Sequence, residues 1–284
     1  MIDFNKLNEP YFIGEIGINH NGDMQICKKL IDAINACNWD CAKFQKRNPD
    51  ICVPEHQKNI MRDTPWGKMT YLEYKYRVEF GKEEYKEIDR YSKEKPVDWT
   101  ASVWDLDSLE FLMQYDLPFI KLPSAMLTND ELLKACKETN KKVIISTGMS
   151  TLEEIEHAVD ILDGHERKHL YAVLHCNSTY PAPLNELNLS AIQTLKNKFQ
   201  CEVGYSGHEF RLGTSVAAVY LGASIIERHI TLDRTMEGSD HLSSVEPQGL
   251  FKLVSGIREL ETAYGDGVIQ VTESEKPVRK KLRG

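Results

Sequence analysis

The chain has 284 residues, enough for one large domain such as an α/β barrel or for two small domains. Hydrophobic residues make up 41% and charged residues 27%, as is usual for a soluble globular protein, and the net charge of −8 argues against an extensive nucleic-acid interface. No apolar run approaches the roughly 18 residues of a membrane helix, and the N-terminus lacks the apolar core of a signal peptide. The seven cysteines form no C-x-x-C pair, which indicates free thiols. We therefore expect a cytoplasmic protein.

Short apolar runs alternate with segments of helical period along the whole chain. We expect strands at residues 11–17, 41–44, 97–101, 119–122, 142–146, 170–175, 202–205 and 224–227. We expect helices at residues 24–37, 82–93, 106–115, 129–139, 189–197, 214–221 and 248–264, with a further helix that begins at a capping box of Ser150 and Glu153. These β–α repeats predict an α/β fold of the (β/α)8 TIM-barrel class, a single domain over residues 1–284.

Three segments show features other than this alternation of strands and helices. Residues 46–70 are polar and have no clear period, and a loop of that length is usually functional or mobile. The basic segment 276–284 is expected to be a solvated end. Residues 204–207 resemble part of a nucleophile elbow, but the second glycine comes one residue too early, which argues against a serine hydrolase.

Polar residues follow the predicted strands, where TIM-barrel enzymes carry their catalytic groups. The strand ends and the loops beyond them supply Glu15, Asn19, His20, Lys43, Gln45, Thr100, Lys121, Ser124, Ser146, Thr147, Ser178, Tyr180, Ser206, His208, His229 and Asp240. Such a joint placement is hard to obtain from packing alone, so we expect an active site at this end of the barrel.

Two histidines, His208 and His229, each follow a predicted strand, and a predicted helix separates them. Because parallel strands point the same way, both imidazoles should emerge at one end of the sheet. Two neutral imidazoles that converge there indicate a divalent-metal site. The alternative is a pair of strand-end histidines that are hydrogen-bonded within the protein.

Two lysines, Lys43 and Lys121, lie among several hydroxyls and indicate a site for a small phosphorylated anion. Either lysine could instead form a Schiff base, as in class I aldolases, or pair with a barrel carboxylate. We favour a fixed charge for Lys121, because its expected neighbours Ser124, Ser146 and Ser206 suit an anion and should not lower an amine pKa by desolvation.

Six motifs in collinear order resemble the sialic acid synthase family. They are GEIGINHNGD (Gly14–Asp23), AKFQ (Ala42–Gln45), ISTGM (Ile145–Met149), LHCNSTYPAP (Leu174–Pro183), GYSGH (Gly204–His208) and IERHITLDRTMEGSDH (Ile226–His241). The resemblance implies a (β/α)8 barrel that condenses phosphoenolpyruvate with an open-chain sugar aldehyde similar to N-acetylmannosamine, giving a sialic-type nonulosonic acid. It also implies a divalent cation, Mn²⁺ or else Mg²⁺ or Co²⁺, bound by His208 and His229.

The resemblance further implies roles for the strand-end residues. Positions around phosphoenolpyruvate match Lys43, Lys121, Ser124, Ser146, Ser178 and Ser206. Positions around the sugar match Gln45, Tyr180 and Asp240, and the catalytic groups match Glu15, Lys43 and Lys121.

The sequence departs from the family pattern in three places. Gly207 replaces the usual aspartate beside His208, so we expect weaker metal binding. Met126 replaces an acidic residue two positions after Ser124, so Glu15 or a metal-bound hydroxide would have to take over its proposed role. Residues 265–284 resemble the family's linker into a small antifreeze-like domain, which we expect to be absent.

These departures leave alternatives open. One is a 3-deoxy-ulosonate synthase that acts on another or a phosphorylated sugar, and another is a barrel that binds sugar or phosphoenolpyruvate without turnover. We expect a homodimer, with a separate lid domain or protein over the barrel mouth. Arg47 and Arg62, in the segment 46–70, are the in-chain candidates for the arginine that such a lid supplies to the sugar.

Overall fold

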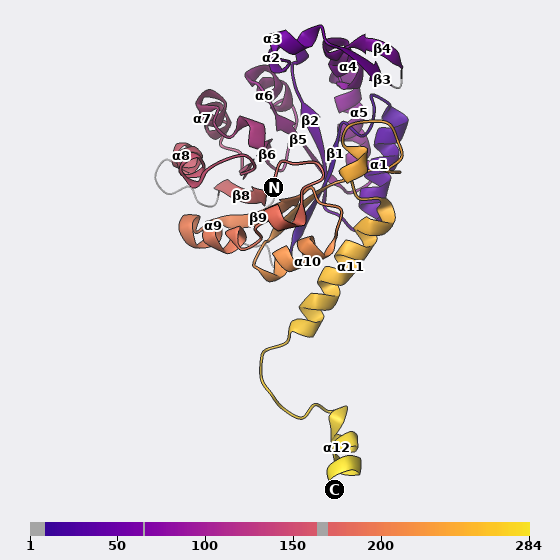
Figure 1. Ribbon diagram of the computed structural model, residues 1–284, viewed down its shortest axis with the longest axis vertical. Coiled ribbons are helices and arrows are strands. Elements are labelled where there is room, and N and C mark those ends of the chain that lie inside the picture. The colour runs from indigo at the N-terminus through magenta and orange to yellow at the C-terminus, as the bar shows by residue number, and fades with distance from the viewer. Residues whose placement is uncertain (1–8, 65, 164–169) are drawn as a thin grey trace.

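Eight parallel strands close into a barrel in a computed structural model that describes residues 9–64, 66–163 and 170–284 (Figure 1). Around the barrel the order is β1-β10-β9-β8-β7-β6-β5-β2. The strands are β1 (Tyr11–Gly17), β2 (Cys41–Lys46), β5 (Asp98–Val103), β6 (Ile120–Leu122), β7 (Val143–Ser146), β8 (Tyr171–Cys176), β9 (Glu202–Gly207) and β10 (Ile225–His229). The predicted (β/α)8 TIM-barrel class is therefore confirmed.

The predicted helices are also present and surround the barrel (Figure 1). They are α1 (Met24–Ala36), α5 (Lys82–Glu94), α6 (Leu106–Leu112), α7 (Asp130–Glu138), α8 (Leu152–Asp163), α9 (Ala191–Phe199), α10 (Gly213–Tyr220) and α11 (Pro247–Tyr264). The capping box of α8 lies one residue later than predicted, since Thr151 and Glu154 exchange the two hydrogen bonds. Both pairs fit the same Ser/Thr-x-x-Glu pattern, so the sequence does not distinguish them.

Inward-facing residues change from apolar to polar along the strands. In β1, Tyr11 and Ile13 precede Glu15, and in β10, Ile225 precedes Glu227. The apolar positions pack together as a small cluster inside the barrel, separate from the larger core between strands and helices. The polar positions therefore form a layer at the carboxyl ends of the strands, with apolar packing beneath it.

The segment 46–70 is not a plain loop. It contains α2 (Pro49–Cys52), α3 (Glu55–Lys58) and a hairpin of β3 (Met61–Thr64) and β4 (Gly67–Thr70), and α4 (Tyr71–Val78) follows directly. Figure 1 shows these elements gathered on one side of the barrel. Short polar elements of this kind have too few residues for a visible period.

The C-terminal tail leaves the barrel after α11. Residues 265–284 are exposed, and α12 (Glu275–Arg283) stands apart from the barrel (Figure 1). The solvated end predicted for this segment is thus a helix, and its likeness to an interdomain linker stays a prediction. No helix in the described ranges is both long enough and apolar enough to cross a membrane.

Candidate active site

A pocket of about 190 Å³ opens at the carboxyl ends of the barrel strands. Its lining includes Glu15, Lys43, Gln45, Ser102, Trp104, Lys121, Ser124, Ser146, Cys176, Ser178, Tyr180, Ser206, His208, Glu227 and His229. The structure therefore brings together all the residues predicted to bind phosphoenolpyruvate and metal, along with Glu15, Gln45 and Tyr180. Asp240 is not part of the lining, and its Oδ2 atom lies 3.8 Å from His229 Nδ1.

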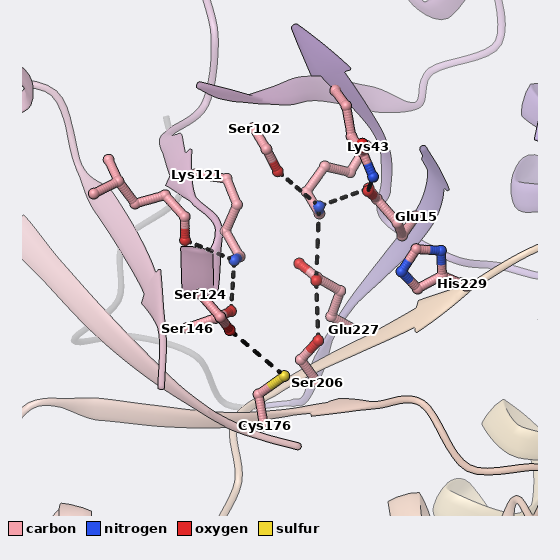
Figure 2. A network of polar contacts seen from close by, with 12 residues as sticks. Glu15, Lys43, Ser102, Lys121, Ser124, Ser146, Cys176, Ser206, Glu227 and His229 are labelled. Atoms are coloured by element: carbon pink, nitrogen blue, oxygen red, sulfur yellow. Dashed lines mark hydrogen bonds and ion pairs between the residues drawn. The ribbon is translucent and has the colours of Figure 1, made fainter. Parts of the chain in front are cut away.

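Lys43 lies at the centre of a buried polar network (Figure 2). Its Nζ atom is 2.6 Å from Glu15 Oε2 and 3.6 Å from Glu227 Oε1, and it donates to Ser102 Oγ at 3.0 Å. Gln45 donates to the other oxygen of Glu15 at 3.0 Å. One cation thus holds two carboxylates that come from β1 and β10.

The charges in this network determine which groups are ionised. Burial raises the pKa of Glu15, although Lys43 opposes the change. Burial also opposes ionisation of Glu227, but Lys43 and Lys121 outweigh it and lower the pKa of Glu227 to about 2. The two carboxylates in turn outweigh burial at Lys43 and raise its pKa. Lys43 is therefore held as a cation and Glu227 as an anion, while Glu15 exchanges a proton more readily.

Lys121 lies across the pocket from Lys43 (Figure 2). Its Nζ atom donates to Ser146 Oγ at 2.6 Å and to the Leu122 carbonyl at 3.0 Å. Burial lowers the pKa of Lys121, so the expectation that these neighbours would not lower an amine pKa by desolvation was wrong. The reason is that Lys121 is only 2% exposed and its hydrogen-bond partners carry no charge.

Ser124 and Ser178 approach the backbone at Gly148, within the ISTGM motif. The Gly148 amide donates to Ser124 Oγ at 3.0 Å. A Cβ atom at position 148 would lie 2.1 Å from Ser178 Oγ and 2.8 Å from Ser124 Oγ. Glycine is therefore required at this position if both hydroxyls are to line the pocket.

Two imidazoles lie at the edge of the same pocket, with the ring centroids of His208 and His229 5.4 Å apart. His208 Nδ1 donates to the Asn177 carbonyl at 2.5 Å, and the Tyr180 hydroxyl donates to His208 Nε2 at 3.0 Å. His229 Nδ1 is buried without a hydrogen-bond partner among the described residues, 3.8 Å from Asp240 Oδ2. Burial lowers the pKa of His229 to about 3, so this imidazole is neutral at pH 7.

These donors fit a divalent cation held by two imidazoles. Because Nδ1–H of His208 is bonded to a carbonyl, its lone pair is on Nε2, where a cation would replace the hydrogen bond from the Tyr180 hydroxyl. Nδ1 of His229 has no partner of its own among the described residues. Within the ranges that the structure describes, no group of three or more His, Cys, Asp or Glu side chains is arranged for a metal. Water or substrate oxygens would therefore have to complete the coordination.

A buried ion pair joins the two loops that carry these histidines. Glu209 follows His208, Arg228 precedes His229, and Arg228 Nη1 lies 2.8 Å from Glu209 Oε1. Arg228 also donates to Ser215 Oγ at 2.9 Å and to the Glu209 carbonyl. Since both charged side chains are fully buried, this pair fixes the position of one imidazole relative to the other.

The same ion pair explains the glycine beside His208. A Cβ atom at Gly207 would lie 2.8 Å from the Tyr205 ring and 2.9 Å from the Glu209 carboxylate. No side chain fits there in this arrangement. The acid next to His208 is thus Glu209, and it faces Arg228 rather than the pocket.

Four strand-end residues expected near the site make structural contacts instead. Asn19 donates to the Ile230 carbonyl, and His20 stacks on Phe80. Thr100 lies one layer below the mouth, where its hydroxyl donates to the Phe119 carbonyl, and Thr147 bonds through its amide to the Leu174 carbonyl.

The other predicted positions around the mouth are more distant. Met126 packs against the hydrophobic core and does not line the pocket. Arg47 stacks on Trp104, with 4.1 Å between the guanidinium carbon and the ring centroid. Arg62 lies in the hairpin, 3.9 Å over the ring of Tyr71.

Sequence reasoning missed several lining residues, among them Ser102, Cys176 and Glu227. Glu227 lies two residues before His229 on β10, and Ser102 lies two residues after Thr100 on β5, so the period of two would have placed them on the inner face. Cys176 Sγ lies 3.8 Å from His208 Nδ1. Burial opposes protonation of His208, but Cys176 outweighs it and raises the pKa of that imidazole.

Comparisons with known proteins agree with this architecture. The model of the NeuB family matches residues 30–269. The chain is 38% identical to N,N'-diacetyllegionaminic acid synthase of Campylobacter jejuni, over 97% of this chain and 85% of that protein. It is 36% identical to human N-acetylneuraminate-9-phosphate synthase, over 96% of this chain and 76% of the human protein. A crystal structure of N-acetylneuraminic acid (sialic acid) synthetase from Leptospira borgpetersenii with citrate superposes with a TM-score of 0.84 at 32% identity, over 98% of this chain and 93% of that chain. The resemblance to the sialic acid synthases is confirmed, and the chain belongs to the NeuB family.

Proposed function

We propose that this enzyme condenses phosphoenolpyruvate with an open-chain 2-acetamido sugar aldehyde to give a nonulosonic acid and inorganic phosphate. The observation that carries the proposal is one pocket in which Lys43 and Lys121, with serine hydroxyls, face the imidazoles His208 and His229. Two buried ammonium groups suit an anion with a phosphate and a carboxylate. The names of the family's relatives, which are synthases of sialic-type acids, support the same reaction.

In this reaction C3 of phosphoenolpyruvate forms a bond to the aldehyde carbon, and C2 becomes electron-poor. Water adds to C2, and the proton it loses ends on the new hydroxyl at the former aldehyde carbon. Phosphate then leaves with its bridging oxygen by cleavage of the C2–O bond, and the C2 hydroxyl gives its proton to the departing phosphate as it becomes the ketone carbonyl. Lys43 and Lys121 would hold the anion in place, and the Glu15 carboxylate, whose pKa is raised by burial, would take the proton from water.

We further propose that His208 and His229 hold a divalent cation, Mn²⁺ or else Mg²⁺ or Co²⁺. When bound, the ion would supply Lewis-acid polarisation of the aldehyde. Tyr180 and Gln45, which line the pocket, and Asp240, whose carboxylate lies 3.8 Å from His229, would contact the sugar.

The proposed partners follow from the shape of the mouth. Met149 is 72% and Tyr180 45% exposed at the rim of the pocket, so the chain by itself leaves the pocket open to water. Because water exclusion strengthens the electrostatic terms of catalysis, we propose a homodimer or a separate lid that covers this rim. A cytoplasmic location is supported by the thiol state of the buried Cys27, Cys136 and Cys176.

The test is condensation by the purified chain with Mn²⁺, phosphoenolpyruvate and a panel of aldoses. Phosphate release and the product mass are measured together. A nonulosonic acid from N-acetylmannosamine or a related 2-acetamido sugar supports the proposal. Turnover of only shorter aldoses would identify a 3-deoxy-ulosonate synthase instead, and binding of phosphoenolpyruvate without turnover of any sugar would identify a non-catalytic barrel.

A further inference from the structure

The loop that follows β10 carries Asp240 to the edge of the active site. Its two ends meet in a bridge between Ile230 and Val245, and the turn His241–Ser243 lies between them. A loop of this length holds a side chain in one place only where other contacts fix it. The Asp240 side chain is 19% exposed, with Oδ2 3.8 Å from His229 Nδ1. The contacts that fix the loop therefore decide where this carboxylate points.

His241, the residue after Asp240, is buried and uses both of its ring nitrogens. Its Nδ1 atom lies 2.7 Å from Thr231 Oγ1, and its Nε2 atom lies 3.4 Å from Asn21 Nδ2. Asn21 Nδ2 also donates to the Glu237 carbonyl at 3.0 Å, so the N–H groups of this amide point toward the loop after β10. Nε2 of His241 is therefore the acceptor, and its Nδ1–H donates to Thr231. The network selects a single neutral tautomer of this imidazole.

These contacts join the loop after β10 to the loop 18–23 that follows β1. Asn21 belongs to this second loop, and so does Asn19, whose Nδ2 atom donates to Ser244 Oγ at 2.8 Å. Ser244 Oγ in turn donates to the Asp240 carbonyl at 2.6 Å. The Asp240 backbone is thus held through Ser244 and through the adjacent His241, and both of these residues are anchored on the loop after β1.

The backbone on both loops is adapted to the ring of His241. Gly238 has a φ of +148°, and a Cβ atom there would lie 2.6 Å from His241 Cδ2. Asn21 has a φ of +52°, in the left-handed region that asparagine enters more readily than most residues. Both positions have unusual backbone conformations, and both lie against the same imidazole. The contact therefore accounts for residues of two sequence motifs, Gly14–Asp23 and Ile226–His241, that the metal and phosphate sites leave unexplained.

We propose that His241 is a positioning residue that fixes the Asp240 carboxylate beside His229 for contact with the sugar. The inference rests on the proposed condensation, because the role of Asp240 toward the sugar comes from it. His241 is 1% exposed and is not among the residues that line the pocket. It therefore acts through its neighbour Asp240 and not by contact with a substrate. Its two hydrogen bonds supply the order that a long loop lacks by itself.

The experiment compares the kinetics of His241→Leu and Asp240→Asn with N-acetylmannosamine, phosphoenolpyruvate and Mn²⁺. In each variant KM for the sugar should rise by about 10- to 100-fold, as expected for loss of a charge-assisted hydrogen bond, while KM for phosphoenolpyruvate stays unchanged. The double variant should be no worse than Asp240→Asn alone, because the two residues act as one unit. His241→Asn should recover part of the loss, since its amide can donate to Thr231. The matched control is His157→Leu, which replaces a histidine that is 59% exposed on α8 and should change neither KM.

Other kinetic outcomes would overturn the inference and leave the condensation intact. A wild-type KM in His241→Leu would show that the loop holds Asp240 without the imidazole. Losses that add in the double variant, or an equal rise in both KM values, would show that His241 supports the fold and not Asp240 in particular. If His241→Leu does not fold, Thr231→Val removes one of the same contacts with a side chain of similar shape, and the same comparisons apply.

A structural readout separates this inference from the proposed function. If the wild-type protein condenses no sugar, the proposed function fails, and a crystal structure of His241→Leu then decides the positioning alone. A carboxylate of Asp240 displaced from His229 supports the inference. A separation that stays at 3.8 Å refutes it.

Discussion

The ion pair between Glu209 and Arg228 offers a sharp test of how the two histidines are held. Both side chains are buried, at 1% and 0% exposure, so Glu209→Gln keeps the size of the side chain and leaves the Arg228 charge without its counterion. Breaking one partner of a buried pair costs about 3–5 kcal/mol. That is a large part of the roughly 5–15 kcal/mol of a typical domain. We expect a fall in Tm of roughly 6–20 °C, since each kcal/mol shifts Tm by about 2–4 °C in chains of this size.

The expected effect of Glu209→Gln is not limited to stability. Because the pair lies next to His208 and His229 in the sequence, Mn²⁺ affinity measured by titration calorimetry below Tm should fall as well. The matched control is Glu83→Gln, which removes a carboxylate from an exposed pair with Lys86 and should change neither quantity appreciably. If Glu209→Gln and Glu83→Gln melt at the same temperature and bind Mn²⁺ equally, the proposed role of the buried pair is refuted.

Three further predictions concern single side chains. His208→Ala should lose Mn²⁺ without unfolding, because the residue lies at the barrel mouth, and equal metal content in variant and wild type would contradict the assignment. Lys121→Met should lower kcat/KM for phosphoenolpyruvate by about 10- to 100-fold, and borohydride with phosphoenolpyruvate should give no lysine adduct by mass spectrometry. The pKa of buried His20 is lowered by burial from 6.5 to about 3, so stability should be lost as pH falls below 6.5, by about 2 kcal/mol near pH 5. His20→Asn should flatten that part of the stability profile in urea unfolding, and an unchanged slope would show that another group controls it.

The fold was predictable because apolar residues recur at regular spacings along the strands and helices of the barrel. The predicted strand at residues 11–17 and helix at residues 24–37 match β1 and α1 closely. The segment 46–70 could not be resolved in the same way, because its helices and strands are four residues long and mostly exposed. Elements of that length depend on tertiary contacts more than on local propensity.

The location of the site was predictable for a related reason. In a parallel barrel the strand ends converge, so Lys43, Lys121 and His229 had to meet once the strands were identified. Thr100 and Ser102 show the limit of that reasoning. The predicted strand stopped at residue 101, whereas β5 continues to Val103, and the polar group at the mouth is therefore Ser102. An error of two residues at a strand end moves a side chain by a whole layer of the barrel.

The contrast between Glu15 and Glu227 shows how binding of an anion would change this site. Both carboxylates contact Lys43, but Lys121 lowers the pKa of Glu227 further, and burial raises the pKa of Glu15. An anion bound between the two lysines would weaken the effect of their charges on both carboxylates. The pKa of Glu15, already raised by burial, would therefore rise further. Phosphoenolpyruvate should therefore be taken up together with a fraction of a proton in slightly acidic buffer. Titration calorimetry in two buffers of different ionisation enthalpy measures this fraction, and Glu15→Gln should abolish it. If the variant takes up as many protons as the wild type, the protons bind elsewhere and Glu15 is not the group that the anion makes more basic.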